Sequence, residues 1–238
     1  MATYVHLMGW GRTNMETHLH REVEQLKTRV LELGGMVEES LQKAVLAISR
    51  NDVALAEQVV QGDSEIDRME VDVEEDCLQI LALYQPVASD LRFIVAVLKL
   101  NNDLERIGDL AVNIAQRVKN LGEFPAVAMP FDFKKMAEKV QQMLRGSLDA
   151  LVNLDPQLAR EICAADQEVD AIHRGVYQGV YDGIRKNPDH LIPLVSTLTV
   201  ARHLERIADH ATNIAEDVIY TVEGQIARHQ SLNEEPTR

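Results

Sequence analysis

The sequence lacks long uncharged apolar runs, and it contains few basic residues. No apolar stretch approaches the roughly 20 residues of a membrane-spanning helix, so we expect no integral membrane segment. Basic residues number 24 against 38 acidic ones, which leaves a net charge of −14 at pH 7. Proteins that bind nucleic acid or anionic lipid present a basic face. The charge therefore argues against both classes of partner.

Cysteine is also scarce, and the signals of β-strands are missing. Cys77 and Cys163 are isolated among apolar positions of helical patterns, so we interpret them as buried, reduced thiols of a cytoplasmic protein. Alternating β-branched runs bounded by turn residues do not occur. Aromatic residues make up only 4%, whereas Leu, Val, Ile and Ala are abundant. This composition predicts an all-α protein.

The sequence does contain one long motif twice, 100 residues apart. Residues 101–118 read NNDLERIGDLAVNIAQRV and residues 201–218 read ARHLERIADHATNIAEDV, with ten of eighteen positions identical. The apolar identities have the spacing of one buried helix face, so a shared core explains them. Glu105, Asp109 and Asn113 form a separate polar stripe, four residues apart. Packing gives a solvated face no reason to keep the same three residues in both copies.

The repeat extends upstream, where residues 63–67 match residues 166–170 at an offset of 103. We predict two tandem, pseudo-symmetric three-helix bundles, with helices over 14–50, 52–84 and 87–121, and then over 131–153, 155–186 and 189–223. The first repeat would cover 15–121 and the second 131–224, joined by the breaker-rich linker 122–130. Residues 1–14 are expected to form a disordered extension, and residues 225–238 a polar tail.

Each repeat contains two acidic pairs that a helical hairpin would bring together. If the first hairpin turns near Pro86, Asp67 lies opposite Glu105 and Asp63 lies opposite Asp109. The same geometry applies to the second repeat. Four carboxylates in one patch repel one another unless a cation neutralises them, and oxygen-rich sites suit hard cations or carboxylate-bridged iron or manganese. The predicted metal ligands are Asp63, Asp67, Glu105 and Asp109 in one site, Asp166, Asp170, Glu205 and Asp209 in the other, with Asn113 and Asn213 as possible additional ligands.

An ordinary structural explanation stands beside the metal hypothesis. Acidic pairs on exposed helices are common, and Arg106 and Arg206 could offset part of the charge in salt bridges. His203 and His210 occur only in the second copy, so a role common to both sites is not expected. We interpret both as exposed helix histidines.

Enzymatic activity is not expected. A ferritin-like di-iron site needs Glu-x-x-His on two helices, and the nearest sequence is Asp170 to His173, whose counterpart in the first repeat has no histidine. No glycine-rich phosphate-binding motif is present. The alternative is a carboxylate-bridged metalloenzyme or metal store of the helical-bundle type, which aerobic turnover of a reductant by the iron-loaded protein would favour.

The motifs resemble those of a known family. Residues 83–98 (LYQPVASDLRFIVAVL), followed by 101–115, resemble one signature of the PhoU family, and residues 203–220 resemble the second. The resemblance covers about residues 15–224. It implies a cytoplasmic accessory and regulatory protein of phosphate-specific transport, built of two three-helix bundles, with metal clusters at its E/D-x-x-x-D motifs. The implied partners are the ATPase subunit of the phosphate ABC transporter and a phosphate-sensing histidine kinase.

From these observations we expect a negative regulator of phosphate uptake and phosphate-starvation signalling. It would bridge the transporter and the kinase, and it would bind iron, zinc, manganese or magnesium ions. A duplicated bundle offers two related faces, which suits a bridge or a homodimer. The acidic surface makes direct binding to DNA an unsuitable route to any change in transcription.

Overall fold

The computed structural model describes residues 4–122, 124 and 127–224, and within them it is all-α, as predicted. No strand occurs in this part of the chain, and a short 3-10 turn at Pro188–His190 is an addition that was not predicted. The six helices are α1 (Tyr4–Arg50), α2 (Val53–Tyr84), α3 (Ala88–Gly122), α4 (Phe133–Asn153), α5 (Pro156–Lys186) and α6 (Leu191–Glu223). The predicted polar tail at 225–238 lies outside the described residues.

The start of α1 corrects the prediction for the N-terminal segment. The helix begins at Tyr4, ten residues before the predicted start, so most of the segment expected to be disordered continues the helix. No proline precedes Pro86 in the sequence. Once a helix is nucleated, each further residue adds one hydrogen bond at little cost. The other helices begin and end within a few residues of the predicted bounds.

Aspartate caps set the starts of α2 and α5. The Asp52 carboxylate accepts a hydrogen bond from the amide of Leu55 at 3.0 Å. Asp155 does the same for the amides of Gln157 and Leu158, at 2.9 and 3.1 Å. A side chain at this position satisfies an amide that has no partner within the helix. The same device opens the second helix of each repeat, so the two hairpins begin alike.

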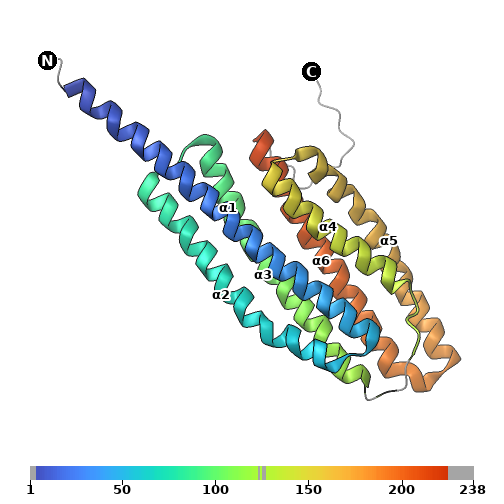
Figure 1. Cartoon of the computed structure of the whole chain (residues 1–238). Helices are drawn as coiled ribbons and strands as arrows, with labels where there is room; N and C mark the ends of the chain where they lie inside the picture. Colours follow the sequence, from blue (N-terminus) through green and yellow to red (C-terminus); the bar gives the residue numbers. More distant parts are fainter. Residues whose placement is uncertain (1–3, 123, 125–126, 225–238) are drawn as a thin grey trace, which may run out of the picture.

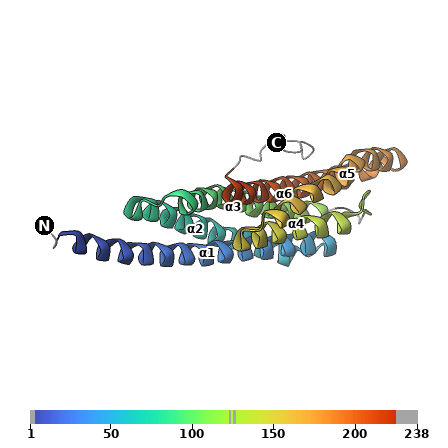
Figure 2. The ribbon, with the colours of Figure 1, turned by 90° about the horizontal axis from the view of Figure 1, so that it is seen from above.

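The six helices form two three-helix bundles joined along α3 and α6 (Figure 1). Helix α1 packs on α2 and α3, and α4 packs on α5 and α6, while α1 and α4 also touch each other. Seen from above, α1 and α4 lie on the same side of α3 and α6 (Figure 2). The chain therefore presents a layer in the order α2, α3, α6, α5, with α1 and α4 covering one of its faces.

Polar contacts show that α3 and α6 run antiparallel. Arg92 donates to the carbonyl oxygen of Thr221 at 3.2 Å, near the start of α3 and the end of α6. Farther along α3, Lys99 Nζ lies 3.2 Å from Asp217 Oδ1. The apolar residues shared by the two motif copies are all buried, among them Leu104 and Leu204 at 0% exposure. The repeated sequence thus builds the central junction of the molecule.

Glycine permits one close approach outside the core. The linker passes directly over α5, where a Cβ atom at Gly179 would overlap the carbonyl oxygen of Pro130. Gly175, one turn earlier on the same helix, has open space where a Cβ would lie. Only Gly179 is therefore required for the path of the linker.

Candidate metal sites

The first acidic cluster lies between α2 and α3. The pKa of Asp63 is raised, first by burial and then by the neighbouring charges of Asp67 and Asp109. The pKa of Glu105 is raised by burial and then by Asp109, with Arg106 opposing, and farther carboxylates, including Asp67, add to the rise. The carboxylates of α2 therefore face those of α3, in the register predicted for a helical hairpin.

The second cluster repeats this arrangement between α5 and α6. Burial raises the pKa of Asp166 to about 6, and the charges of Asp170, Asp209 and Glu205 add to the effect. The pKa of Asp209 is raised by burial and then by Glu205 and Asp170. The second cluster is therefore a set of carboxylates that oppose one another's ionisation.

Both clusters open on one face of the molecule. Helix α1 covers one side of the seam between α2 and α3, and α4 covers one side of the seam between α5 and α6. The carboxylates that remain accessible, such as Asp109 with a side chain 41% exposed, must lie on the other side. The two clusters also lie at similar heights along the helix axes. Asp103 on α3, two residues before Glu105, contacts His210 on α6, the residue after Asp209. One uncovered face thus presents both clusters side by side.

The donor set fits a cation, although the side chains do not enclose one as they stand. Within the described residues, no three carboxylate, imidazole or thiol groups lie close enough together to hold one ion. Like charges without a counterion are expected to splay apart. In the part of the chain that the structure describes, the buried Oδ1 of Asp166 has no hydrogen-bond partner. Eight carboxylates in two patches, one with an oxygen that forms no hydrogen bond within the described residues, suit oxygen-ligated cations such as Mg²⁺, Mn²⁺ or iron.

Ordinary salt bridges offset part of the charge, through Arg106 as the alternative explanation proposed, and within the described residues through Arg174 in place of the expected Arg206. Arg106 lies 3.4 Å from Glu105 and 3.4 Å from Asp109 in the first cluster. Arg174 lies 3.7 Å from Asp170 in the second. These arginines are half-exposed or more, so their pairs contribute little to stability. Both explanations therefore describe part of the site, and metal binding stays a prediction.

The two asparagines of the stripes occupy different surroundings. Nδ2 of Asn213 donates to Oδ1 of Asp103 across the junction, at 3.4 Å. Asn213 therefore belongs to the contact between α3 and α6, beside the second cluster. Asn113 is partly buried and continues the stripe of α3. Its assignment as a possible ligand remains a prediction.

The interpretation of two histidines as exposed residues is wrong. The His210 side chain is 17% exposed, and its Nδ1 lies 2.7 Å from Oδ1 of Asp103, which is itself buried. Both ring nitrogens of His203 are buried, and neither forms a hydrogen bond with any residue that the structure describes. Burial lowers the pKa of His203 to about 4, and Arg117, Arg206 and Arg202 lower it further. The packing of α6 on α3 buries both rings.

Sequence reasoning therefore missed the polar contacts of the junction. The signal that could have identified them was a difference between the copies. Asp103 and Leu110 in the first motif become His203 and His210 in the second. In the antiparallel pair Asp103 contacts His210, which corresponds to Leu110 and not to Asp103, so the two different motif positions that meet can carry complementary residues. Departures from the repeat mark this interface.

The cysteines are free, as predicted. Cys77 is fully buried and Cys163 partly so. Burial raises the pKa of the Cys77 thiol to about 12 and that of Cys163 to about 11. A thiol with a raised pKa holds little thiolate near neutral pH and is a weak nucleophile there.

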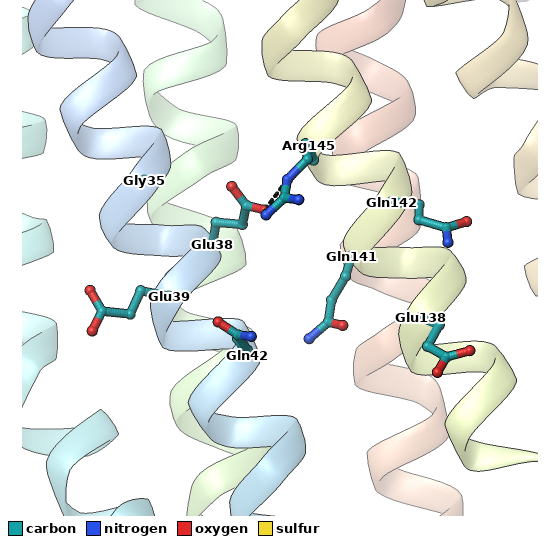
Figure 3. Close-up of a pocket in the computed structure, with 8 residues that line it drawn as sticks. All are labelled: Gly35, Glu38, Glu39, Gln42, Glu138, Gln141, Gln142 and Arg145. Atoms are coloured by element: carbon teal, nitrogen blue, oxygen red, sulfur yellow. Dashed lines mark hydrogen bonds and ion pairs between the residues drawn. The ribbon is translucent and has the colours of Figure 1, made fainter.

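A second polar feature lies on the opposite face, between α1 and α4. It is a groove of about 380 Å³, in which Glu38 and Arg145 turn toward each other and form an ion pair with Nε to Oε1 at 2.6 Å (Figure 3). The groove is lined by Gly35, Glu38, Glu39, Gln42, Glu138, Gln141, Gln142 and Arg145. It joins the two repeats on the covered side and is separate from both acidic clusters.

Among the described residues, no helix combines the length and the apolar character needed to cross a membrane.

Comparison with known proteins identifies the family. The PhoU domain model matches residues 30–118 and 133–218, one match in each repeat. A protein of Aquifex aeolicus, named phosphate-specific transport system accessory protein PhoU homolog, is 38% identical over 91% of this chain and 98% of its own. The Escherichia coli K12 protein of the corresponding name is 34% identical over 91% of each chain.

Solved structures agree with the sequence comparison. The crystal structure of PhoU from Pseudomonas aeruginosa has a TM-score of 0.83 at 36% identity, covering 87% of this chain and 99% of that one. The phosphate transport system regulatory protein PhoU from Streptococcus pneumoniae has a TM-score of 0.78 at 29% identity, over 89% and 98% of the chains. Two matched domains, two repeated helical bundles and relatives aligned over nearly their whole length show that this chain belongs to the PhoU family.

Proposed function

We propose that this protein restrains phosphate uptake and phosphate-starvation signalling when phosphate is plentiful. It does so by bridging the ATPase subunit of the phosphate ABC transporter and a phosphate-sensing histidine kinase, without chemistry of its own. The names of its relatives as accessory or regulatory proteins of phosphate transport support the general role. Its location is the cytoplasm, where both partners have their catalytic domains.

The observation that carries the proposal is the shared face of the two repeats. Because α1 and α4 cover the other side of each seam, we place both acidic clusters side by side on the uncovered side of the layer. Packing does not explain why both repeats keep these carboxylates. A face that presents the same polar group twice suits contact with a partner or with a second copy of the chain, as in a homodimer.

Metal ions bound at the clusters have a structural role in this proposal. A cation in the first cluster is held by Asp63, Asp67, Glu105 and Asp109, and one in the second by the four equivalent carboxylates. When bound, the ion supplies a positive charge that removes the mutual repulsion of its ligands. The carboxylates come from two helices, so they tie α2 to α3 and α5 to α6 and hold the face in one shape.

Deletion and complementation test the regulatory role. Deleting the gene should switch on phosphate-scavenging genes in phosphate-replete cells, and the wild-type gene should silence them. A variant in which Glu105, Asp109, Glu205 and Asp209 are all alanine should fail to silence them and should lose the ATPase or the kinase in pull-down. The matched control replaces two exposed glutamates of the opposite groove, Glu39 and Glu138, and should behave as wild type.

One outcome contradicts the regulatory role, and another contradicts only the proposed contact surface. If the deletion leaves the phosphate genes silent and neither partner is recovered, the regulatory role is wrong. Aerobic oxidation of a reductant by the iron-loaded protein would then support the alternative of a helical-bundle metalloenzyme. If the fourfold variant complements as well as the control, the acidic face is not the contact surface.

A further inference from the structure

The two acidic clusters differ by one residue with a different coordination chemistry. At the offset of 103 that aligns α2 with α5, Glu70 in the first repeat corresponds to His173 in the second. Both residues lie one helical turn from the nearer carboxylate of their pair, Asp67 or Asp170. Their side chains therefore belong to the same seam as the clusters. The first cluster gains a fifth carboxylate at this position, and the second gains an imidazole.

The structure places the His173 ring at the second cluster. Its Nδ1 lies 3.9 Å from Oε1 of Glu205, and the side chain is only 15% exposed. Its Nε2 is buried and has no hydrogen-bond partner in residues 4–122, 124 and 127–224. A buried ring nitrogen without a partner is costly in an apolar surrounding. The Oδ1 atom of Asp166, in the same cluster, is also buried without a hydrogen-bond partner among the described residues. The ring that approaches Glu205 thus has one nitrogen, and the cluster one oxygen, without a hydrogen bond in this part of the chain.

The equivalent position in the first cluster is already occupied by protein contacts. Nδ2 of Asn101 donates to the carbonyl oxygen of Glu70 at 2.8 Å and to its Oε1 at 3.1 Å. The residue that corresponds to Asn101 in the second repeat is Ala201, which has no donor. Where Glu70 is replaced by His173, the asparagine amide that binds Glu70 is therefore also lost. The His173 ring packs against Tyr177, with ring centroids 5.8 Å apart, and its Nε2 is not used in a hydrogen bond within the described residues.

We propose that His173 is a metal ligand and that the two clusters select different cations. The second site, with imidazole nitrogen beside carboxylates, takes a borderline transition metal ion such as Zn²⁺ or Fe²⁺. The first site, with oxygen donors only, takes Mg²⁺ or Mn²⁺. Imidazole favours zinc and iron, whereas an all-oxygen set favours the harder ions. This inference rests on the metal sites of the proposed function and assigns them separate identities.

Pulsed electron paramagnetic resonance of the full-length protein loaded with Mn²⁺ tests the assignment. An imidazole ligand couples its nitrogen nucleus to the manganese electron spin, and carboxylate ligands do not. We expect nitrogen coupling in the wild-type protein and none in His173→Gln. A Glu70→His variant should add a nitrogen-coupled ion at the first site. One equivalent of Zn²⁺ added to the manganese protein should remove the nitrogen-coupled population first.

Affinity provides a second readout. His173→Gln should weaken Zn²⁺ binding at one site by more than the roughly 10–100-fold loss that follows removal of a group that merely orients a ligand. Circular dichroism of the variant should match wild type, because glutamine keeps the helix. Manganese bound at both sites without nitrogen coupling, and unchanged Zn²⁺ affinity in His173→Gln, would overturn this inference and leave the proposed metal sites intact. A protein that binds neither Mn²⁺ nor Zn²⁺ would overturn the metal sites themselves.

Discussion

Replacing Asp166 by asparagine should stabilise the metal-free protein at neutral and alkaline pH. Asparagine has nearly the same shape as aspartate but no charge. In the folded protein the pKa of Asp166 is raised from 3.8 to about 6, first by burial and then by three neighbouring carboxylates. Ionisation of this group in the folded state is therefore unfavourable, and the substitution removes that penalty.

The direction with pH follows from the higher pKa in the folded state. Well below pH 3.8 the carboxyl group is protonated in both the folded and the unfolded chain, so the aspartate has no penalty. As the pH rises through about 6 the folded state must ionise it, and stability is lost. The difference between the two pKa values corresponds to ~3 kcal/mol at full strength. Solvent screening of this partly exposed side chain reduces it to about 1–1.5 kcal/mol.

Thermal and urea unfolding in the presence of a chelator measure this effect. At pH 8 the Asp166→Asn variant should exceed wild type by about 1–1.5 kcal/mol, or roughly 2–6 °C in Tm for a chain of this size. At pH 4, close to the ordinary aspartate value of 3.8, most of this difference should be gone. Glu161→Gln, an exposed change on the same helix, is the control and should have no such pH dependence. Saturating Mn²⁺ should reverse the order, because wild type then gains binding free energy that the variant lacks.

Equal stability of the Asp166→Asn variant and wild type at pH 8 would refute the electrostatic reasoning. A stability difference of the same size at pH 4 and pH 8 would do so as well. In that case the substitution would act through packing or hydrogen bonding, and the cluster would not hold the repulsive charge that motivates a bound cation.

Three further predictions test the metal sites, the helix packing and the thiols. Replacing Glu105 and Asp109 by alanine should remove about half of the bound metal, measured by elemental analysis, with the helix content unchanged, and full metal content would contradict the first site. Gly175→Ala should stabilise the protein by about 0.5–1 kcal/mol. Gly179→Ala should destabilise it by about 1–3 kcal/mol, because the added methyl group meets the linker backbone. Equal urea midpoints for the two variants would be inconsistent with this path of the linker. The Cys77 thiol, with a pKa of about 12, should react with a chromogenic disulfide only after denaturation.

The repeated sequence determined most of the fold through local signals. Helices α2 to α6 begin and end near their predicted bounds because apolar periodicity, aspartate caps and breakers are local signals. The pairing of Asp63 with Asp109, and of Asp166 with Asp209, also followed from the sequence, because two helices joined by a short turn have only one register. The start of α1 was missed because extension of an existing helix needs no signal of its own.

Only the tertiary structure decided how the two repeats face each other. The sequence contains no local signal for the antiparallel packing of α3 on α6, because contacts across a hundred residues depend on which surfaces remain after each bundle closes. That packing buries His210 against Asp103 and sets both acidic clusters at one level on one face. The tertiary structure also shows that Nε2 of His173 has no hydrogen-bond partner within the described residues, although the residue itself was visible in the sequence. Local spacing determines which side chains share a helix face, and long-range packing determines what that face meets.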